Sequence, residues 1–265
     1  MDGMAEIETN EARQALFVGE GSMTNRAISL AGLRHFIRKH CITDDMPTWK
    51  VVEEYIKPAT AEAGTAYTAL LATKCDKGGT PFLGIANYFI SHSWGSNFMN
   101  LVDVVAQVTH TAISAGDAVP YIWFDIIAIN QHNPGDIAMC LDRLDRPIAH
   151  SGKLLLVLDP WRKPAALSRV WCLLEIMKAI KLEAKIIMRM PQASQREFFQ
   201  AVTKNHGEVE KLLTSAHVAD AQATVETDKW AIFAKIQRQL GASARVSPHT
   251  LFFISGTISL SVIDL

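Results

Sequence analysis

One short stretch of the sequence gathers several side chains that could act on a ligand. Ser91-His92-Ser93-Trp94-Gly95 places two hydroxyls, an imidazole and an indole within five residues. The polar groups could hydrogen-bond to a sugar or a phosphate, and the indole could stack on a base. The alternative is structural: the hydroxyls cap the following helix, Trp94 packs locally, and His92 is an ordinary hydrogen-bonding group.

Two carboxylates are further candidates. Asp125 interrupts the apolar run 121–129, and it needs a partner because an unpaired buried charge is very costly. It could accept hydrogen bonds from Ser91, His92 or backbone amides, or it could contact a ligand directly. Glu175 shares a helix face with Trp171 and Lys178, so an exposed salt bridge with Lys178 is the alternative to a functional role.

Alternating strand and helix signals in the middle of the chain would position these side chains. Short apolar runs predict strands at residues 87–91, 121–129, 153–158 and 184–190. Amphipathic patterns predict helices at about 98–116, 136–150 and 168–180. Ser168 would cap the last helix, and Pro147 could end the one before it early. This alternation predicts a parallel sheet with helices on both faces.

Ligands of such sheets bind beyond the carboxyl ends of the strands. Three loops rich in polar or aromatic residues follow the first three strands, at residues 91–95, 130–135 and 159–162. The last of them leads into the helix that holds Glu175. We therefore expect Glu175 and these loops to lie on one edge of the domain.

The chain divides into three zones. Residues 1–80 are expected to form an N-terminal helical region, with apolar stripes at 30–40 and 49–56. Residues 81–192 would form the α/β domain, after a turn-rich break at 75–79. Residues 193–265 would form a C-terminal helical region and a tail.

Composition narrows the classes of function. The chain has 265 residues, 49% of them hydrophobic, which is enough for a sizeable core. A formal net charge of -1 without any basic run argues against a nucleic-acid-binding protein. Without a signal peptide or a long apolar stretch, we expect no membrane association. The 4 cysteines form no metal-binding or disulfide pattern, so we expect reduced thiols, no metal site and a cytoplasmic location.

Several motifs together resemble the TIR domain family. They are YFISHSW (88–94), KLLLVLDPW (153–161) and LSRVWCLLEI (167–176). A closer likeness is to a divergent TIR-like group of algae, oomycetes and other protists, whose pattern is similar to KPATAEAGTAY, FISHSWG, IWFDIIAINQH, VLDPWRKPAALSRVWCLLEI and a late Asp-Lys. The resemblance runs from about Ile56 to Gly241 and so covers most of the chain.

The resemblance implies a flavodoxin-like fold. TIR domains either self-associate as signalling modules or hydrolyse NAD, often in defence. In the enzymatic members the glutamate of the Trp-Cys-Leu-x-Glu helix is catalytic, and it corresponds to Glu175 here. The loop 91–94 would hold the nucleotide, and the loop 128–136 would gate the pocket. Plant-type domains carry Phe-Arg-Gly where this chain has His92-Ser93-Trp94, so no arginine role is transferred to that loop.

The expected reaction is cleavage of the nicotinamide–ribose bond of NAD, through an oxocarbenium-like transition state. Nicotinamide leaves as a neutral group and needs no protonation, so one carboxylate, Glu175, is sufficient to stabilise the positive charge. NAD is the substrate, and neither a cofactor nor a metal is required. The expected substrate-binding residues are Ser91, His92, Ser93, Trp94, Asp125 and Trp171.

Two other functions stay open. The chain could be a non-catalytic TIR-like module that self-associates, or an enzyme acting on a related N-glycoside. If Glu175 faces a cleft lined by Ser91, His92, Trp94 and Asp125, catalysis is favoured. If it points to solvent beside Lys178, the interaction module is favoured.

Overall fold

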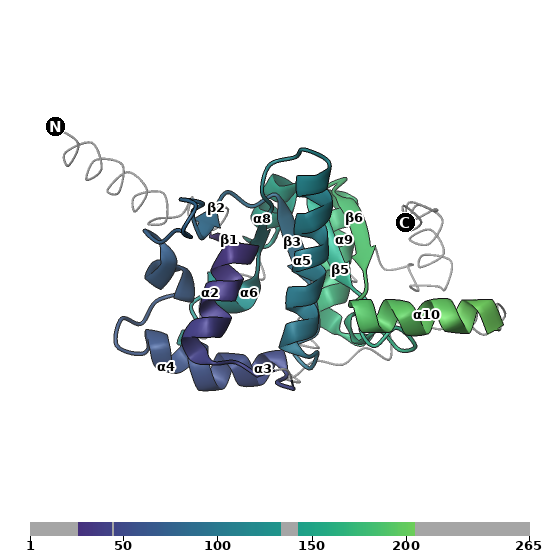
Figure 1. The fold of residues 1–265 in the computed structure, drawn as a ribbon, viewed down its shortest axis with the longest axis horizontal. Helices are drawn as coiled ribbons and strands as arrows, with labels where there is room; N and C mark the ends of the chain where they lie inside the picture. The colour runs from purple at the N-terminus through teal and green to yellow at the C-terminus, as the bar shows by residue number, and fades with distance from the viewer. Residues whose placement is uncertain (1–25, 44, 134–142, 205–265) are drawn as a thin grey trace, which may run out of the picture.

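The computed structural model describes residues 26–43, 45–133 and 143–204. In this part of the chain, a six-stranded sheet with the order β2-β1-β4-β3-β5-β6 forms the centre of an α/β fold (Figure 1). The strands are β1 (Ala27–Ser29), β2 (Leu83–Gly84), β3 (Tyr88–Ser91), β4 (Tyr121–Trp123), β5 (Lys153–Val157) and β6 (Lys185–Arg189).

The sheet is mostly parallel. Strands β4, β3, β5 and β6 pair in parallel, which confirms the expectation from the alternating pattern. Strand β1 is antiparallel to both β4 and β2, so the whole sheet is mixed. Crossover connections that contain helices join the parallel strands, as this strand direction requires.

Helices cover both faces of the sheet. They are α2 (Leu30–His40), α3 (Thr48–Val51), α4 (Lys57–Thr60), α5 (Phe98–Ser114), α6 (Asp125–Ala128), α8 (Asp145–Ser151), α9 (Val170–Lys181) and α10 (Gln192–Lys204). A π-helical segment, Val52–Ile56, joins α3 to α4, and 3₁₀ turns lie at Tyr67–Leu71 and Ala165–Ser168. In Figure 1, α2 and α5 lie in front of the sheet, and α8 and α9 lie behind it.

Strand β3 shows how the apolar runs build the two layers. Phe89 faces the core on the side of α8 and α9, and Ile90 faces the core on the side of α2 and α5. Because successive side chains of a strand point to opposite faces, a strand covered on both sides is apolar at every position. The same alternation directs Ser91 toward α9.

Three details of the predicted elements are wrong. Strand β4 ends at Trp123, and Asp125 begins helix α6, where its carboxylate accepts a hydrogen bond from the Ile126 amide. Ser168 does not cap α9: it lies in a 3₁₀ turn, where its hydroxyl donates to a backbone carbonyl, and Arg169 holds the cap position. Pro147 does not end α8 but lies in its first turn, where a missing N–H is tolerated.

The N-terminal segment is part of the same layered structure. Strand β1 pairs with β4, and α2 packs on α5 within one continuous core. The sheet and the core therefore continue across residue 80, where the sequence pattern suggested a boundary. Among the described helices, none combines the length and the apolar character that crossing a membrane requires. The predicted helical regions before residue 26 and after residue 204 lie outside the described residues.

Candidate functional site

The strand order fixes where a ligand site is expected. The chain leaves β3 through α5 on one face of the sheet and returns to β5 through α8 on the other. The connections therefore diverge between β3 and β5, and such a switch point at the carboxyl ends of the strands is where open α/β sheets bind ligands. Ser91 is the last residue of β3, and α9, which carries Glu175, follows β5.

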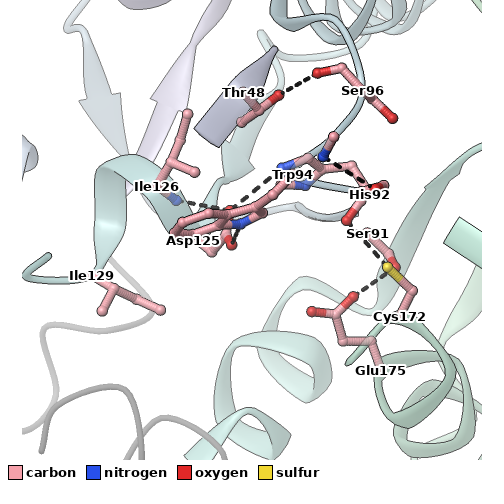
Figure 2. A network of polar contacts seen from close by, with 12 residues as sticks. Thr48, Ser91, His92, Trp94, Ser96, Asp125, Ile126, Ile129, Cys172 and Glu175 are labelled. Atoms are coloured by element: carbon pink, nitrogen blue, oxygen red, sulfur yellow. Dashed lines mark hydrogen bonds and ion pairs between the residues drawn. The ribbon is translucent and has the colours of Figure 1, made fainter. Parts of the chain in front are cut away.

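Ser91 and Glu175 meet at this switch point. The Ser91 hydroxyl donates a hydrogen bond of 2.6 Å to Oε2 of Glu175 (Figure 2). Ser91 is completely buried, whereas Glu175 is only partly buried. The two residues are far apart in the sequence, and the switch-point topology brings them together.

Glu175 lies in an environment that disfavours its charged form. The pKa of Glu175 is raised to about 8: burial is the main cause, the hydrogen bond from Ser91 opposes it, and the nearby Asp125 charge adds to the rise. The carboxyl group is therefore mostly neutral at pH 7 in the free protein. A carboxyl with such a pKa at the ligand-binding edge of a sheet is typical of functional sites.

Lys178 is not the partner of Glu175. Its side chain is buried, and its ammonium group forms an ion pair with Asp145 at the start of α8. The exposed Glu175–Lys178 salt bridge, which was the structural alternative for this glutamate, is therefore absent. The geometry that was expected to favour an interaction module is not the one observed.

Asp125 forms the second half of the candidate site. The Trp94 indole Nε1 donates a hydrogen bond of 2.7 Å to its Oδ2, and the Ile126 amide donates one of 2.8 Å to its Oδ1. The His92 Nε2 atom lies 3.8 Å from Oδ1. Of the expected donors, a backbone amide is found, whereas Ser91 donates to Glu175 and the His92 Nε2 atom makes no hydrogen bond to the described residues; the indole of Trp94 was not expected. Figure 2 shows this group beside Ser91 and Glu175.

His92 is a buried, neutral imidazole. Its ring packs edge-on against Phe124, with ring centroids 4.9 Å apart. Burial lowers the pKa of His92, the Asp125 charge partly opposes this, and Arg169 lowers it further. Its Nε2 atom has no hydrogen-bond partner among the described residues. The neutral imidazole therefore lies near the Asp125 carboxylate without a hydrogen bond to it and adds no positive charge to the site.

Cys172 connects the two halves of the site, a role that no pattern in the sequence predicts. Its thiol donates a hydrogen bond of 3.1 Å to the backbone carbonyl of His92, one turn before Glu175 on α9. Burial raises the pKa of the Cys172 thiol, and the charge of Glu175 acts in the same direction. A raised pKa disfavours the thiolate, which is the nucleophilic form of cysteine. Cys172 is therefore a structural thiol, and its hydrogen bond connects α9 to the loop after β3.

The remaining expected ligand-binding residues are placed differently. Ser93 is buried, and its hydroxyl accepts a hydrogen bond from the Gly95 amide, so it shapes the loop. Asn97, and not either serine, caps α5 by accepting from the Met99 and Asn100 amides. Trp171 is partly buried and packs against the core beneath α8 and α9. The structure therefore brings Ser91 to Glu175, and Trp94 to Asp125 with His92 nearby, whereas no contact of Ser93 or Trp171 with either carboxylate is found among the described residues.

The loops after β4 and β5 are held by contacts within the protein. His132 is 2.8 Å from the Thr60 hydroxyl, and the Asn130 amide donates to the Gly64 carbonyl over 2.7 Å. In the loop after β5, the buried Asp159 accepts hydrogen bonds from Asn100 and Ser194. These contacts hold the described parts of the loops after β4 and β5 in place.

Comparison of the chain with models of protein families, with curated proteins and with solved structures finds no match. The geometry of Glu175, Ser91, Trp94 and Asp125 is therefore the basis for assigning a function.

Proposed function

We propose that this chain is a TIR-like NAD hydrolase, with a flavodoxin-like fold, in which Glu175 is the catalytic carboxylate. The observation that carries the proposal is the hydrogen bond between Ser91 and Glu175 at the switch point between β3 and β5. The order of the four parallel strands is compatible with a flavodoxin-like sheet. The motifs around Ser91 and Glu175 are the ones that resemble enzymatic TIR domains.

The proposed chemistry needs one accessible carboxylate. When the bond between ribose C1′ and the nicotinamide nitrogen breaks, its electron pair goes to the ring nitrogen and neutralises the pyridinium. Positive charge develops on the ribose, and the Glu175 carboxylate stabilises it. Water then adds to C1′ and loses a proton, which gives ADP-ribose and nicotinamide.

Asp125 and Trp94 would support substrate binding in this proposal. Asp125 adds a second negative charge near Glu175, and this charge favours a cationic nicotinamide ring over a neutral one. The Trp94 ring is partly buried, and its nitrogen is already bonded to Asp125. The exposed part of the ring would pack against the substrate, in keeping with the role of aromatic walls in ligand sites.

The pH dependence of the reaction follows from the same environment. Because Glu175 must be ionised to stabilise the ribosyl cation, kcat/KM should rise as the pH increases through about 8 and level off above it. Binding of the cationic nicotinamide ring beside Glu175 would itself favour the ionised carboxyl, so the profile of kcat should begin to rise at a lower pH than that of kcat/KM.

The experiment is incubation of the purified full chain with NAD, with nicotinamide and ADP-ribose separated by chromatography. Wild type should release both products, Glu175→Ala should release neither, and Glu197→Ala, which changes an exposed glutamate on α10, should behave as wild type. The protein is assayed at both low and high concentration, so that a need for assembly is covered. Equal turnover by wild type and Glu175→Ala would contradict the assignment.

A second candidate function is self-association without catalysis. Ile180 near the end of α9 and Phe199 on α10 are large apolar side chains that are 48% and 45% exposed. Exposed apolar side chains of this size can form part of a protein interface. If no nicotinamide is released at any protein concentration while sedimentation shows concentration-dependent assembly that Ile180→Glu abolishes, this second function replaces the first.

A further inference from the structure

We infer that Ser91 is a positioning residue, which holds Oε2 of Glu175 so that the other carboxylate oxygen, Oε1, is presented to the substrate. The inference rests on the proposed function, because it concerns the orientation of the proposed catalytic group. It also changes the role that the sequence motif suggested for Ser91, which was direct contact with the nucleotide.

Burial separates the roles of the two residues. Ser91 has no exposed surface, so its hydroxyl cannot touch a ligand without a rearrangement of the sheet. Its position is fixed by the parallel pairing of β3 with β5, in which Ser91 is opposite Leu156. Glu175 is only partly buried, so the glutamate is the member of the pair that can reach a substrate.

Only one oxygen of the carboxyl group is held. Oε2 accepts the hydrogen bond from Ser91, and among the described residues no hydrogen bond to Oε1 is found. A glutamate side chain has several rotatable bonds and loses catalytic power when it samples many orientations. A donor fixed at the end of a strand removes most of this freedom while it leaves Oε1 available.

Ser91 also opposes the other groups that act on Glu175. Asp125 at the start of α6 is the acidic neighbour, whereas the Cys172 thiol on α9 and His92 in the loop after β3 are neutral, and Arg169 at the start of α9 acts on His92 and Cys172. Burial and Asp125 raise the pKa of Glu175, whereas the Ser91 hydrogen bond lowers it. Removal of the Ser91 hydroxyl should therefore both raise the pKa of Glu175 and misorient its carboxylate.

The kinetic test uses Ser91→Ala and Ser91→Cys, the second of which keeps a weak donor of similar size. For Ser91→Ala, kcat should fall about 10- to 100-fold, KM should stay within about twofold, and the pH profile should move to higher pH. Ser91→Cys should lie between Ser91→Ala and wild type in both respects. Thr109→Ala is the matched control, because it removes a buried hydroxyl on α5 that bonds only to its own helix.

A raised KM with unchanged kcat would overturn the inference, because that result would place Ser91 in contact with the substrate. Thermal unfolding of each variant shows whether the variant is folded. If Ser91→Ala is not folded, kcat and KM of Ser91→Cys are compared with those of wild type instead.

A second readout does not depend on NAD hydrolysis. NMR of protein with ¹³C-labelled glutamate carboxyls, with the Glu175 signal identified by its loss in Glu175→Gln, gives the titration midpoint of Glu175 directly. The midpoint should be higher in Ser91→Ala than in wild type, and an unchanged midpoint would overturn the inference. A raised midpoint in a protein that never releases nicotinamide would support the hold of Ser91 on Glu175 and refute the proposed function.

Discussion

Lys178 forms its ion pair with Asp145 on α8, although Glu175 lies only three residues before it on its own helix. The ammonium group is buried beneath α8 and α9, while the Asp145 side chain is half exposed. This pairing links the two helices on one face of the sheet. It also leaves the Glu175 carboxyl free of any cationic partner on its own helix and directed toward Ser91.

Removal of Asp145 should destabilise the protein more than removal of Lys178. Asp145→Ala leaves a buried ammonium group without a partner, which should lower the free energy of unfolding by about 3 kcal/mol. Lys178→Met keeps an apolar stem of similar length and leaves only a half-exposed carboxylate unpaired, so its cost should be below about 1.5 kcal/mol. Urea denaturation of both variants measures the difference, and the reverse ranking would contradict the buried pairing.

Glu175 should make stability dependent on pH. The carboxyl has a pKa of about 8 in the folded chain and an ordinary value of 4.5. Between these values the folded state binds a proton that the unfolded state does not, so stability from this group should decrease as the pH rises through that window. Glu175→Gln should lack this component, and its free energy of unfolding should exceed that of wild type at about pH 9 but not at about pH 4. Parallel slopes for both proteins would show that Glu175 titrates normally.

Trp94→Phe tests the bond between the indole and Asp125. The change keeps an aromatic ring but removes the Nε1–H donor, so the free energy of unfolding should fall by about 1–2 kcal/mol and KM for NAD should rise. Trp49→Phe is the matched control, because the Trp49 side chain is 48% exposed on α3. Identical KM values for wild type and Trp94→Phe would show that the orientation of Asp125 is irrelevant to binding.

Thr60→Val tests how the loop after β4 is held. The Thr60 hydroxyl donates to the Ile56 carbonyl over 2.7 Å, so it must accept from Nε2–H of His132. Loss of both bonds should cost about 1 kcal/mol and should speed hydrogen exchange of the backbone amides in residues 129–133. Thr111→Val, an exposed hydroxyl on α5, should leave this exchange unchanged. Equal exchange in wild type and Thr60→Val would mean that other contacts hold the loop.

Much of the fold was predictable because its signals are local. The apolar runs that became β3 and β5 are covered on both faces, the run that became β6 is a partly buried edge strand, and the amphipathic stripes of α2, α5 and α9 follow the helical period. The end of strand β4 within the apolar run 121–129 was not predictable in this way. Ile126 and Ile127 are buried in the short helix α6, and two buried apolar residues are equally consistent with a continued strand. Strand β1 was missed because three residues give too short a pattern.

The candidate site was only partly predictable, for a different reason. The switch-point rule places the loop after β3 and the start of α9 on one edge, so the meeting of Ser91 with Glu175 follows from topology. The choice of donor for each carboxylate depends on tertiary packing. Trp94 donates to Asp125, and Cys172 donates to the His92 carbonyl. Both bonds depend on side-chain orientations that the spacing of residues in the sequence does not predict.

The most direct test of the central claim is the rate of nicotinamide release from NAD by wild type and by Glu175→Gln, measured above pH 8, where the wild-type carboxyl is ionised. The substitution keeps the size of the side chain and its ability to accept from Ser91, and it removes only the charge. We expect wild type to turn over NAD and Glu175→Gln to be slower by at least about 100-fold. Comparable rates for the two proteins would contradict a catalytic role for Glu175.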